Sequence, residues 1–107
     1  MKDTAQPAPT TELVLRALHH LIDPEVGVNV VDLGMIADVE VAPDGAAVVV
    51  ILPTTPGCPM HEVLADGARA IVGNLHGVTS VDVRFVYSPP WTPDRITPGG
   101  REALNRR

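Results

Sequence analysis

The stretch of the sequence that most constrains the fold is an apolar run followed by an amphipathic helix. Val48–Leu52 is the most apolar run of the chain and is typical of a strand. A proline-containing loop leads from it into a helix predicted from Pro59 to about Leu75, where apolar residues recur at helical spacing. Alternation over Val78–Tyr87 then predicts another strand. Because a long helix separates the two strands, they can run parallel through a right-handed crossover.

Further elements are predicted on the N-terminal side of this unit. Thr10 or Thr11 can cap a helix that ends before Pro24, since the residue before a proline avoids the helical region. Met35–Ala42 alternates in the manner of a half-buried strand. Pro43-Asp44-Gly45 then predicts a short hairpin turn into the return strand, because proline presets φ and glycine accepts a left-handed position.

The return strand, Ala46–Leu52, is apolar on both faces, so we expect both faces to be covered. Two helices can cover only one side of a sheet. The other side then needs the C-terminal tail or another subunit. The tail carries Trp91, which is expected to pack across the sheet or across the cysteine loop, the loop before Pro59 that contains Cys58, rather than stack on a ligand. The tail also carries a short capped helix predicted over Thr97–Asn105. Because this tail is small, the sequence predicts a homodimer in which the tail and a second copy share that face.

Charge and cysteine content exclude several classes of function. The 107 residues suffice for one domain, which we predict over residues 11–107 after a disordered tail at 1–10. A net charge of −5 disfavours nucleic acids and anionic membranes as partners, because both require clustered lysines and arginines. A single cysteine excludes an internal disulfide and a metal site built from several cysteines of one chain. Without an apolar run of membrane-spanning length or a signal-like segment, a cytoplasmic protein is expected.

The only cysteine, Cys58, stands directly before Pro59. Proline is favoured in the first turn of a helix, which predicts Cys58 at or next to the N-cap. Unpaired backbone N–H groups and the positive end of the helix dipole stabilise a thiolate there and lower a cysteine pKa. The alternative is a small buried hydrophobe, which is the usual role of a lone cysteine. The flanking prolines and Gly57 favour a partly exposed loop.

Four other polar residues have both a structural and a functional interpretation. Asp23 and Glu25 lie in a tight loop where acidic residues commonly stabilise turns. The structural interpretation of Asp32 is that its carboxylate accepts local hydrogen bonds from loop N–H groups. His61 lies three residues after Cys58, near enough to polarise its thiol, although a histidine at an exposed helix start is usually just solvated.

Four motifs together resemble a known family. In chain order they are Asp23-Pro24-Glu25-Val26-Gly27, Val31-Asp32-Leu33-Gly34, Thr54-Thr55-Pro56-Gly57-Cys58-Pro59 and Pro89-Pro90-Trp91-Thr92-Pro93. Their order and spacing resemble the metal–sulfur cluster assembly factors, which include the SufT-like and PaaD-like proteins and a subunit of the eukaryotic cytosolic iron–sulfur targeting complex. The resemblance covers about Leu13 to Leu104. It points to the SufT-like group, because PaaD-like members carry additional C-terminal cysteines.

The resemblance implies an α+β fold, a two-layer α-β-β-α-β domain with a three-stranded mixed sheet. It also implies a non-enzymatic role in iron–sulfur cluster assembly and transfer, with the assembly machinery and client apoproteins as partners. The family's site corresponds here to Cys58, supported by Asp23, Glu25, Thr54 and Thr55.

At this site, Cys58 is expected to contact iron or an iron–sulfur cluster transiently, because iron–sulfur chemistry prefers thiolate ligands. No cofactor is therefore expected in the purified protein. One cysteine cannot hold a cluster alone, so a dimer, a client cysteine or a small thiol must complete the ligands. Asp32, His61 and Trp91 are minor candidates for the site. The alternative hypothesis is a redox enzyme that uses the Cys58 thiol, although the chain has no second cysteine to resolve it.

Overall fold

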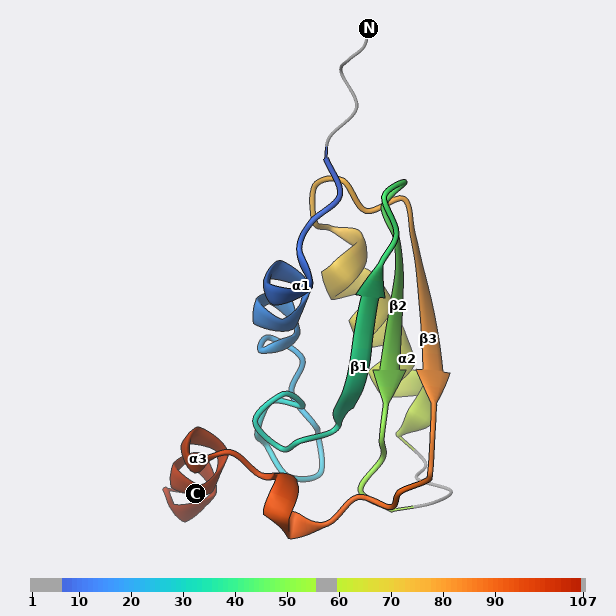
Figure 1. The fold of residues 1–107 in the computed structure, drawn as a ribbon. Helices are drawn as coiled ribbons and strands as arrows, with labels where there is room; N and C mark the ends of the chain where they lie inside the picture. The colour runs from blue at the N-terminus through green and yellow to red at the C-terminus, as the bar shows by residue number, and fades with distance from the viewer. Residues whose placement is uncertain (1–6, 56–59, 107) are drawn as a thin grey trace, which may run out of the picture.

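The computed structural model describes residues 7–55 and 60–106, which form a small sheet with helices beside it (Figure 1). The elements in chain order are α1 (Thr11–Leu18), β1 (Ile36–Val41), β2 (Ala46–Ile51), α2 (His61–Gly73), β3 (Ser80–Phe85), a 3₁₀ helix η1 (Pro93–Arg95) and α3 (Pro98–Asn105). β2 is the central strand, antiparallel to β1 and parallel to β3. The predicted α+β fold with a three-stranded mixed sheet is confirmed.

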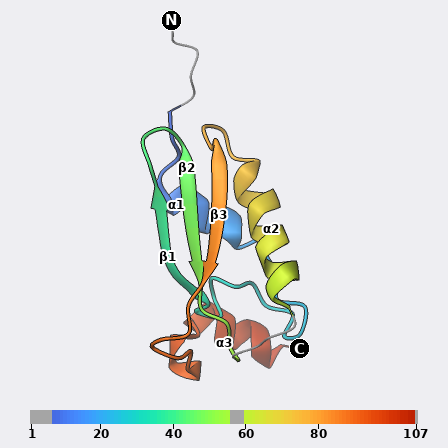
Figure 2. The same cartoon turned by 90° about the vertical axis from the view of Figure 1, so that its right-hand side faces the viewer.

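Both α1 and α2 lie on one face of the sheet, and Figure 2 shows this two-layer arrangement from the side. On that face β2 contributes Ala47, Val49 and Ile51, all of them buried. The other core side chains come from the two helices and from loop residues; they are Val14, Leu18, Leu21, Val28, Val30, Leu33, Met35, Leu64, Ala68 and Val72. Burial of this apolar surface is the main favourable contribution to folding. In the part of the chain that is described, none of the helices is both long and apolar enough to cross a membrane.

Local signals for caps and turns are confirmed at three positions. The Thr10 hydroxyl accepts a hydrogen bond from the Leu13 N–H at 3.1 Å and caps α1. The Thr97 hydroxyl accepts one from the Gly100 N–H at 3.0 Å and caps α3. Gly45, in the hairpin between β1 and β2, has a φ of +92°, which a side chain would disfavour.

The first helix is shorter than the sequence predicts. α1 ends at Leu18, with His19 as its C-cap, and does not continue to Pro24. Beyond it, Ile22 is exposed and pairs with Asn29 in an isolated antiparallel bridge. The chain before the proline is therefore extended, because a hairpin supplies the backbone hydrogen bonds that a longer helix would have made.

The second helix begins later than predicted. Met60 is its N-cap and His61 its first residue, so the helix does not start at Pro59. The first helical hydrogen bond runs from the Leu64 N–H to the Met60 carbonyl at 2.8 Å, and the Met60 side chain packs against the core. Proline only favours a position in the first turn, so it does not fix the first residue of the helix. Cys58 itself lies outside the described residues, two positions before the cap in the sequence.

The opposite face of the sheet has no helix over it among the described residues (Figure 2). On this side of β2, Val48 and Val50 are half-buried rather than covered. The strands on both sides flank them in register with charged residues, namely Asp38, Glu40, Asp82 and Arg84. The expectation that the C-terminal tail covers this face is wrong, because residues 86–106 run along one end of the sheet (Figure 1). Charged cross-strand neighbours make the face compatible with water. The homodimer stays a prediction.

The central loop, residues 29–35, is organised around the Asp32 carboxylate. Asn29 Nδ2 donates to Asp32 Oδ2 and Thr97 Oγ1 donates to Asp32 Oδ1, each at 2.9 Å, and His19 Nε2 lies 3.7 Å from Oδ1. The hydrogen bond from Asn29 is the largest cause that lowers the pKa of Asp32 below its ordinary 3.8. Partial burial opposes this effect, and Thr97 and His19 lower the pKa further.

The C-terminal arm, residues 86–106, is fastened to the central loop by side chains that donate to backbone carbonyls. Trp91 Nε1 donates to the Leu33 carbonyl at 2.8 Å, and Arg95 Nε donates to the Gly34 carbonyl at 2.7 Å. Gly34 has a φ of +75°, and a Cβ at this position would collide with the backbone carbonyl of Arg95. The arm can therefore approach the loop this closely only because residue 34 is glycine.

We predict that Gly34→Ala lowers the free energy of unfolding by roughly 2 kcal/mol or more, because it adds a collision with the arm to the cost of a positive φ. Gly27→Ala is the matched control: Gly27 has a φ of +80°, but a Cβ added there would meet no atom within 4 Å beyond its own chain neighbours. In the control the free energy of unfolding should fall by only about 1 kcal/mol, the cost of holding alanine at a positive φ. Urea unfolding of both variants measures the difference, and equal losses would contradict the close packing of the arm.

A second prediction concerns Asp32 and pH. Because its folded pKa is depressed, Asp32 contributes stability that is present above its unfolded pKa of about 3.8 and lost as the pH falls through the lower folded value. Asp32→Asn should therefore cost about 1–2 kcal/mol at neutral pH, and the gap to the wild type should narrow below about pH 4. The control Asp66→Asn removes an exposed carboxylate and should change stability by less than about 0.5 kcal/mol. If the difference in unfolding free energy between the wild type and Asp32→Asn stays constant between pH 6 and pH 3, the depressed pKa of Asp32 is refuted.

Candidate functional site

The acidic loop, residues 22–29, is a small hairpin stabilised by Asp23. This side chain is only 1% exposed, and its Oδ1 accepts hydrogen bonds from the backbone N–H groups of Glu25 at 2.8 Å and Val26 at 3.2 Å. The Asp23 N–H donates to the Val28 carbonyl at 3.0 Å and closes the hairpin. The Asp23 carboxylate thus stabilises the turn, whereas the neighbouring residue Glu25 is exposed on the same loop.

A series of backbone hydrogen bonds connects the acidic loop to the end of β2. The Val30 N–H donates to the Leu21 carbonyl at 2.9 Å, and the Met35 N–H donates to the Val30 carbonyl at 3.0 Å. The Leu52 N–H then donates to the Met35 carbonyl at 2.6 Å, two residues before Thr54. Figures 1 and 2 both show the acidic loop and the segment after β2 at the same end of the molecule. Two predicted parts of the site, separated in sequence, therefore share one end of the fold.

A pocket of about 160 Å³ adjoins Thr54 at this end. Its lining residues come from the segment after β2 and from the C-terminal arm; they are Leu52, Pro53, Thr54, Tyr87, Pro90 and Trp91. Trp91 thus packs beside the start of the cysteine loop, which is one of the two arrangements that the sequence predicted. Thr55 is exposed next to the pocket. The volume is below that of pockets for drug-sized ligands and suits one side chain or a small molecule.

His61, the first residue of α2, packs against the end of β3. Its ring stacks on Phe85 with centroids 4.4 Å apart and planes inclined by 16°, and the Tyr87 hydroxyl oxygen lies 3.2 Å from His61 Nε2. Phe85 and Tyr87 were not among the predicted site residues. The period-two alternation of the strand was the available signal, because it places both on one side of the chain. The His61 ring is therefore held by two aromatic neighbours and is not merely solvated.

The remaining predicted residues divide into two groups. Asp32 hydrogen-bonds within the central loop and to the C-terminal arm, so the structure gives it a positioning role. Cys58 lies outside the described residues, so the structure gives no distance from its sulfur to Asp23, Glu25 or His61. Within residues 7–55 and 60–106, no three histidine, aspartate or glutamate side chains form a group that could hold a metal ion.

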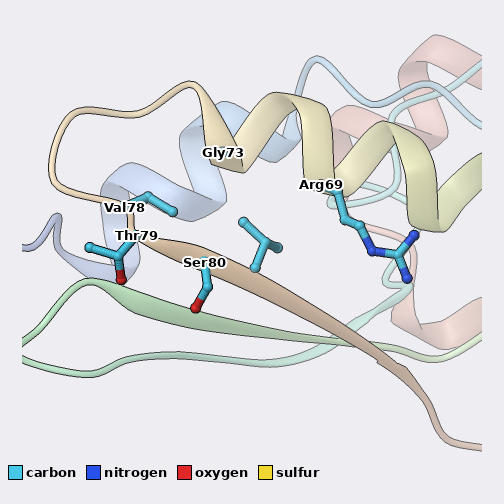
Figure 3. A pocket seen from close by; sticks show the side chains of 6 residues that line it. Arg69, Gly73, Val78, Thr79 and Ser80 are labelled. Atoms are coloured by element: carbon cyan, nitrogen blue, oxygen red, sulfur yellow. The ribbon is translucent and has the colours of Figure 1, made fainter.

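A larger cavity of about 260 Å³ lies at the other end of the sheet, between α2 and the start of β3 (Figure 3). Arg69 and the segment with Thr79 and Ser80 are among its lining residues. The guanidinium of Arg69 lies 3.2 Å from the Asp66 carboxylate, which compensates its charge. Figure 3 shows that Arg69 extends away from Thr79 and Ser80. The polar groups do not converge on one point, so this cavity is not part of the candidate site.

Comparison with known proteins identifies relatives of the chain. The iron–sulfur cluster assembly protein family matches residues 11–83 of the chain. The Fe-S protein maturation auxiliary factor YitW of Bacillus subtilis is 33% identical over 93 residues, which cover 87% of this chain and 91% of that protein. The Fe-S protein maturation auxiliary factor SufT of Staphylococcus aureus is 33% identical over 84 residues, which cover 78% of this chain and 96% of that protein.

A solved structure extends the comparison to the fold. The crystal structure of a domain of unknown function from Bacillus anthracis matches with a TM-score of 0.85 and 31% sequence identity, covering 90% of this chain and 92% of that one. The family that the four sequence motifs predicted is therefore confirmed, and the matched residues include the acidic loop, the central loop and the start of α2. The chain belongs to the iron–sulfur cluster assembly protein family.

Proposed function

We propose that this protein is a cytoplasmic, non-enzymatic auxiliary factor that helps iron–sulfur clusters reach client proteins, and that the Cys58 thiolate contacts the cluster or its iron in passing. Its relatives are named maturation auxiliary factors, which supports a role in cluster assembly. A thiolate is the ligand that iron–sulfur chemistry prefers, and Cys58 is the only thiol of the chain.

The observation that carries the proposal is the connection between the acidic loop and the segment that leads to Cys58. The backbone hydrogen bonds from Leu21 through Met35 to Leu52 fix both at one end of the fold. Glu25 is exposed on the acidic loop, and Thr54 lines the adjoining pocket. A carboxylate and a threonine hydroxyl near a cluster can accept or donate hydrogen bonds that tune the ligand and the leaving thiolate.

The cluster is cargo in this proposal, so its remaining ligands come from elsewhere. One thiolate supplies one ligand, whereas clusters are commonly held by four. A cysteine of the client, a small thiol or Cys58 of a second copy would complete the set. The client is the preferred source, because transfer then needs only exchange of one thiolate for another at the iron. The small pocket beside Thr54 has apolar and aromatic walls that would receive one side chain of such a client.

The central prediction is that Cys58→Ser folds normally but fails in cluster maturation. A hydroxyl stays protonated at neutral pH and ligates iron poorly, while the change in volume is small. The measurement is the activity of iron–sulfur enzymes in cells whose only copy is the serine variant, together with iron and sulfide content after anaerobic mixing with a client apoprotein. Ser80→Ala, at the other end of the sheet, is the control. Full activity of iron–sulfur enzymes with the serine variant would refute the role of Cys58, and peroxide turnover that requires Cys58 would favour the redox enzyme.

Paired variants of the acidic loop separate stability from function. Asp23→Asn should lower the free energy of unfolding by about 1–2 kcal/mol, because a buried carboxylate that accepts two backbone hydrogen bonds is replaced by an amide. Glu25→Gln changes an exposed residue and should shift the unfolding free energy by less than about 0.5 kcal/mol while lowering maturation activity. Denaturant unfolding and the cellular assay are read in parallel. A Glu25→Gln variant with wild-type maturation would remove Glu25 from the site.

A further inference from the structure

Helices α1 and α2 form an open groove on their outer side that the candidate site does not use. It has a volume of about 410 Å³, and its lining residues are Leu13, Arg16, Ala17, His20, Ile71, Asn74 and Leu75. This interhelix groove follows α1 and the C-terminal part of α2. Since α2 begins beside the candidate site and runs away from it, the α2 side of the groove lies away from that site (Figure 1), whereas His20 on the α1 side stands two residues before the acidic loop.

The floor of the interhelix groove consists of two apolar rows. Leu13 and Ala17 are four residues apart on α1, so they lie on one face of that helix. Ile71 lies in the last turn of α2, and Leu75 follows the helix, which ends at Gly73. The core is filled by other residues of α1, and Leu13 remains 42% exposed. Leu13 is therefore the exposed apolar side chain of the groove, beside Ile71 and Leu75, which are half-buried against the core.

The rim of the interhelix groove is positive. Arg16 and His20 are the ionisable lining residues, and no lining residue is acidic. The other arginines of the described chain are engaged: Arg69, Arg84 and Arg106 pair with carboxylates, and Arg95 and Arg101 donate to backbone carbonyls. Arg16 has neither kind of partner within the described residues. Arg16 is exposed, so its guanidinium is available to pair with a carboxylate of a bound segment.

We propose that the interhelix groove binds a short acidic amphipathic segment of a partner protein. Apolar side chains one turn apart would lie between the two rows, and an aspartate or glutamate of the segment would pair with Arg16. The groove is open along its length, which suits a helix laid into it and does not enclose a lipid chain. Its small size predicts a weak and reversible contact. This goes beyond the proposed role of Cys58, because it adds a docking surface that leaves the cluster site free.

The test is a titration of the isotope-labelled full chain with two synthetic helical peptides, followed by NMR. Both peptides are alanine-based with leucines at i and i+4, and they differ only in a glutamate or a lysine one turn further along. We expect saturable shifts at Leu13, Ala17, Ile71 and Leu75, with the glutamate peptide bound about threefold to tenfold more tightly. Arg16→Glu should reverse this preference.

Three variants keep the outcome decisive. Arg84→Glu makes the same charge change on β3 and should leave the preference for the glutamate peptide unchanged. Leu13→Asp alters an exposed position, so it should fold and lose binding of both peptides. Cys58→Ser should bind both peptides like the wild type, which separates this proposal from the function of the cluster site. The proposal would be overturned by equal affinity for the two peptides or by the absence of a saturable shift. It would also be overturned by shifts at these positions that depend on protein concentration alone, which would indicate a second copy in the groove.

Discussion

The backbone hydrogen bonds that join Leu21, Val30, Met35 and Leu52 are the constraint on which the candidate functional site depends. Residues 19–35 contain an isolated bridge but no helix or strand, yet several of their side chains belong to the core. A buried irregular segment is stable only if its N–H and C=O groups find partners, because each unpaired group costs free energy comparable to a lost hydrogen bond. Pairing with one another and with the end of β2 satisfies these groups and fixes two loops in a defined position.

The rest of the site is assembled on this frame. The central loop carries Asp32, whose carboxylate accepts a hydrogen bond from the Thr97 hydroxyl of the C-terminal arm. The same arm places Trp91 beside the segment after β2. On the other side, the start of α2 is held by the stacking of His61 on Phe85. Loop residues that are supported by a helix, a strand and the C-terminal arm lose less entropy when a partner binds.

The strands, the hairpin and the parallel crossover could be predicted because each depends on local alternation and on the length of the helix between two strands. The ends of the helices could not. Pro24 marked a boundary that α1 does not reach, because the chain before it makes hairpin hydrogen bonds instead. Helix α2 begins at His61, two residues after Pro59 in the sequence. The predicted place of the C-terminal tail was also wrong (Figure 1), and the charged residues that flank the apolar row of β2 could not be predicted because they depend on the strand register.

By itself the sequence determined the family and the order of the elements, because four short motifs carry the family in their residue types and spacing, and periodicity marks the helices and strands. Only the tertiary structure decided how those residues divide their roles. It made Asp23 a buried turn residue beside an exposed Glu25, joined Thr54 with Tyr87 and Trp91 in one pocket, and left Arg16 without a carboxylate partner among the described residues. The physical reason is range: periodicity and turn chemistry act over a few residues, whereas pairing of distant polar groups depends on which backbones the core brings together.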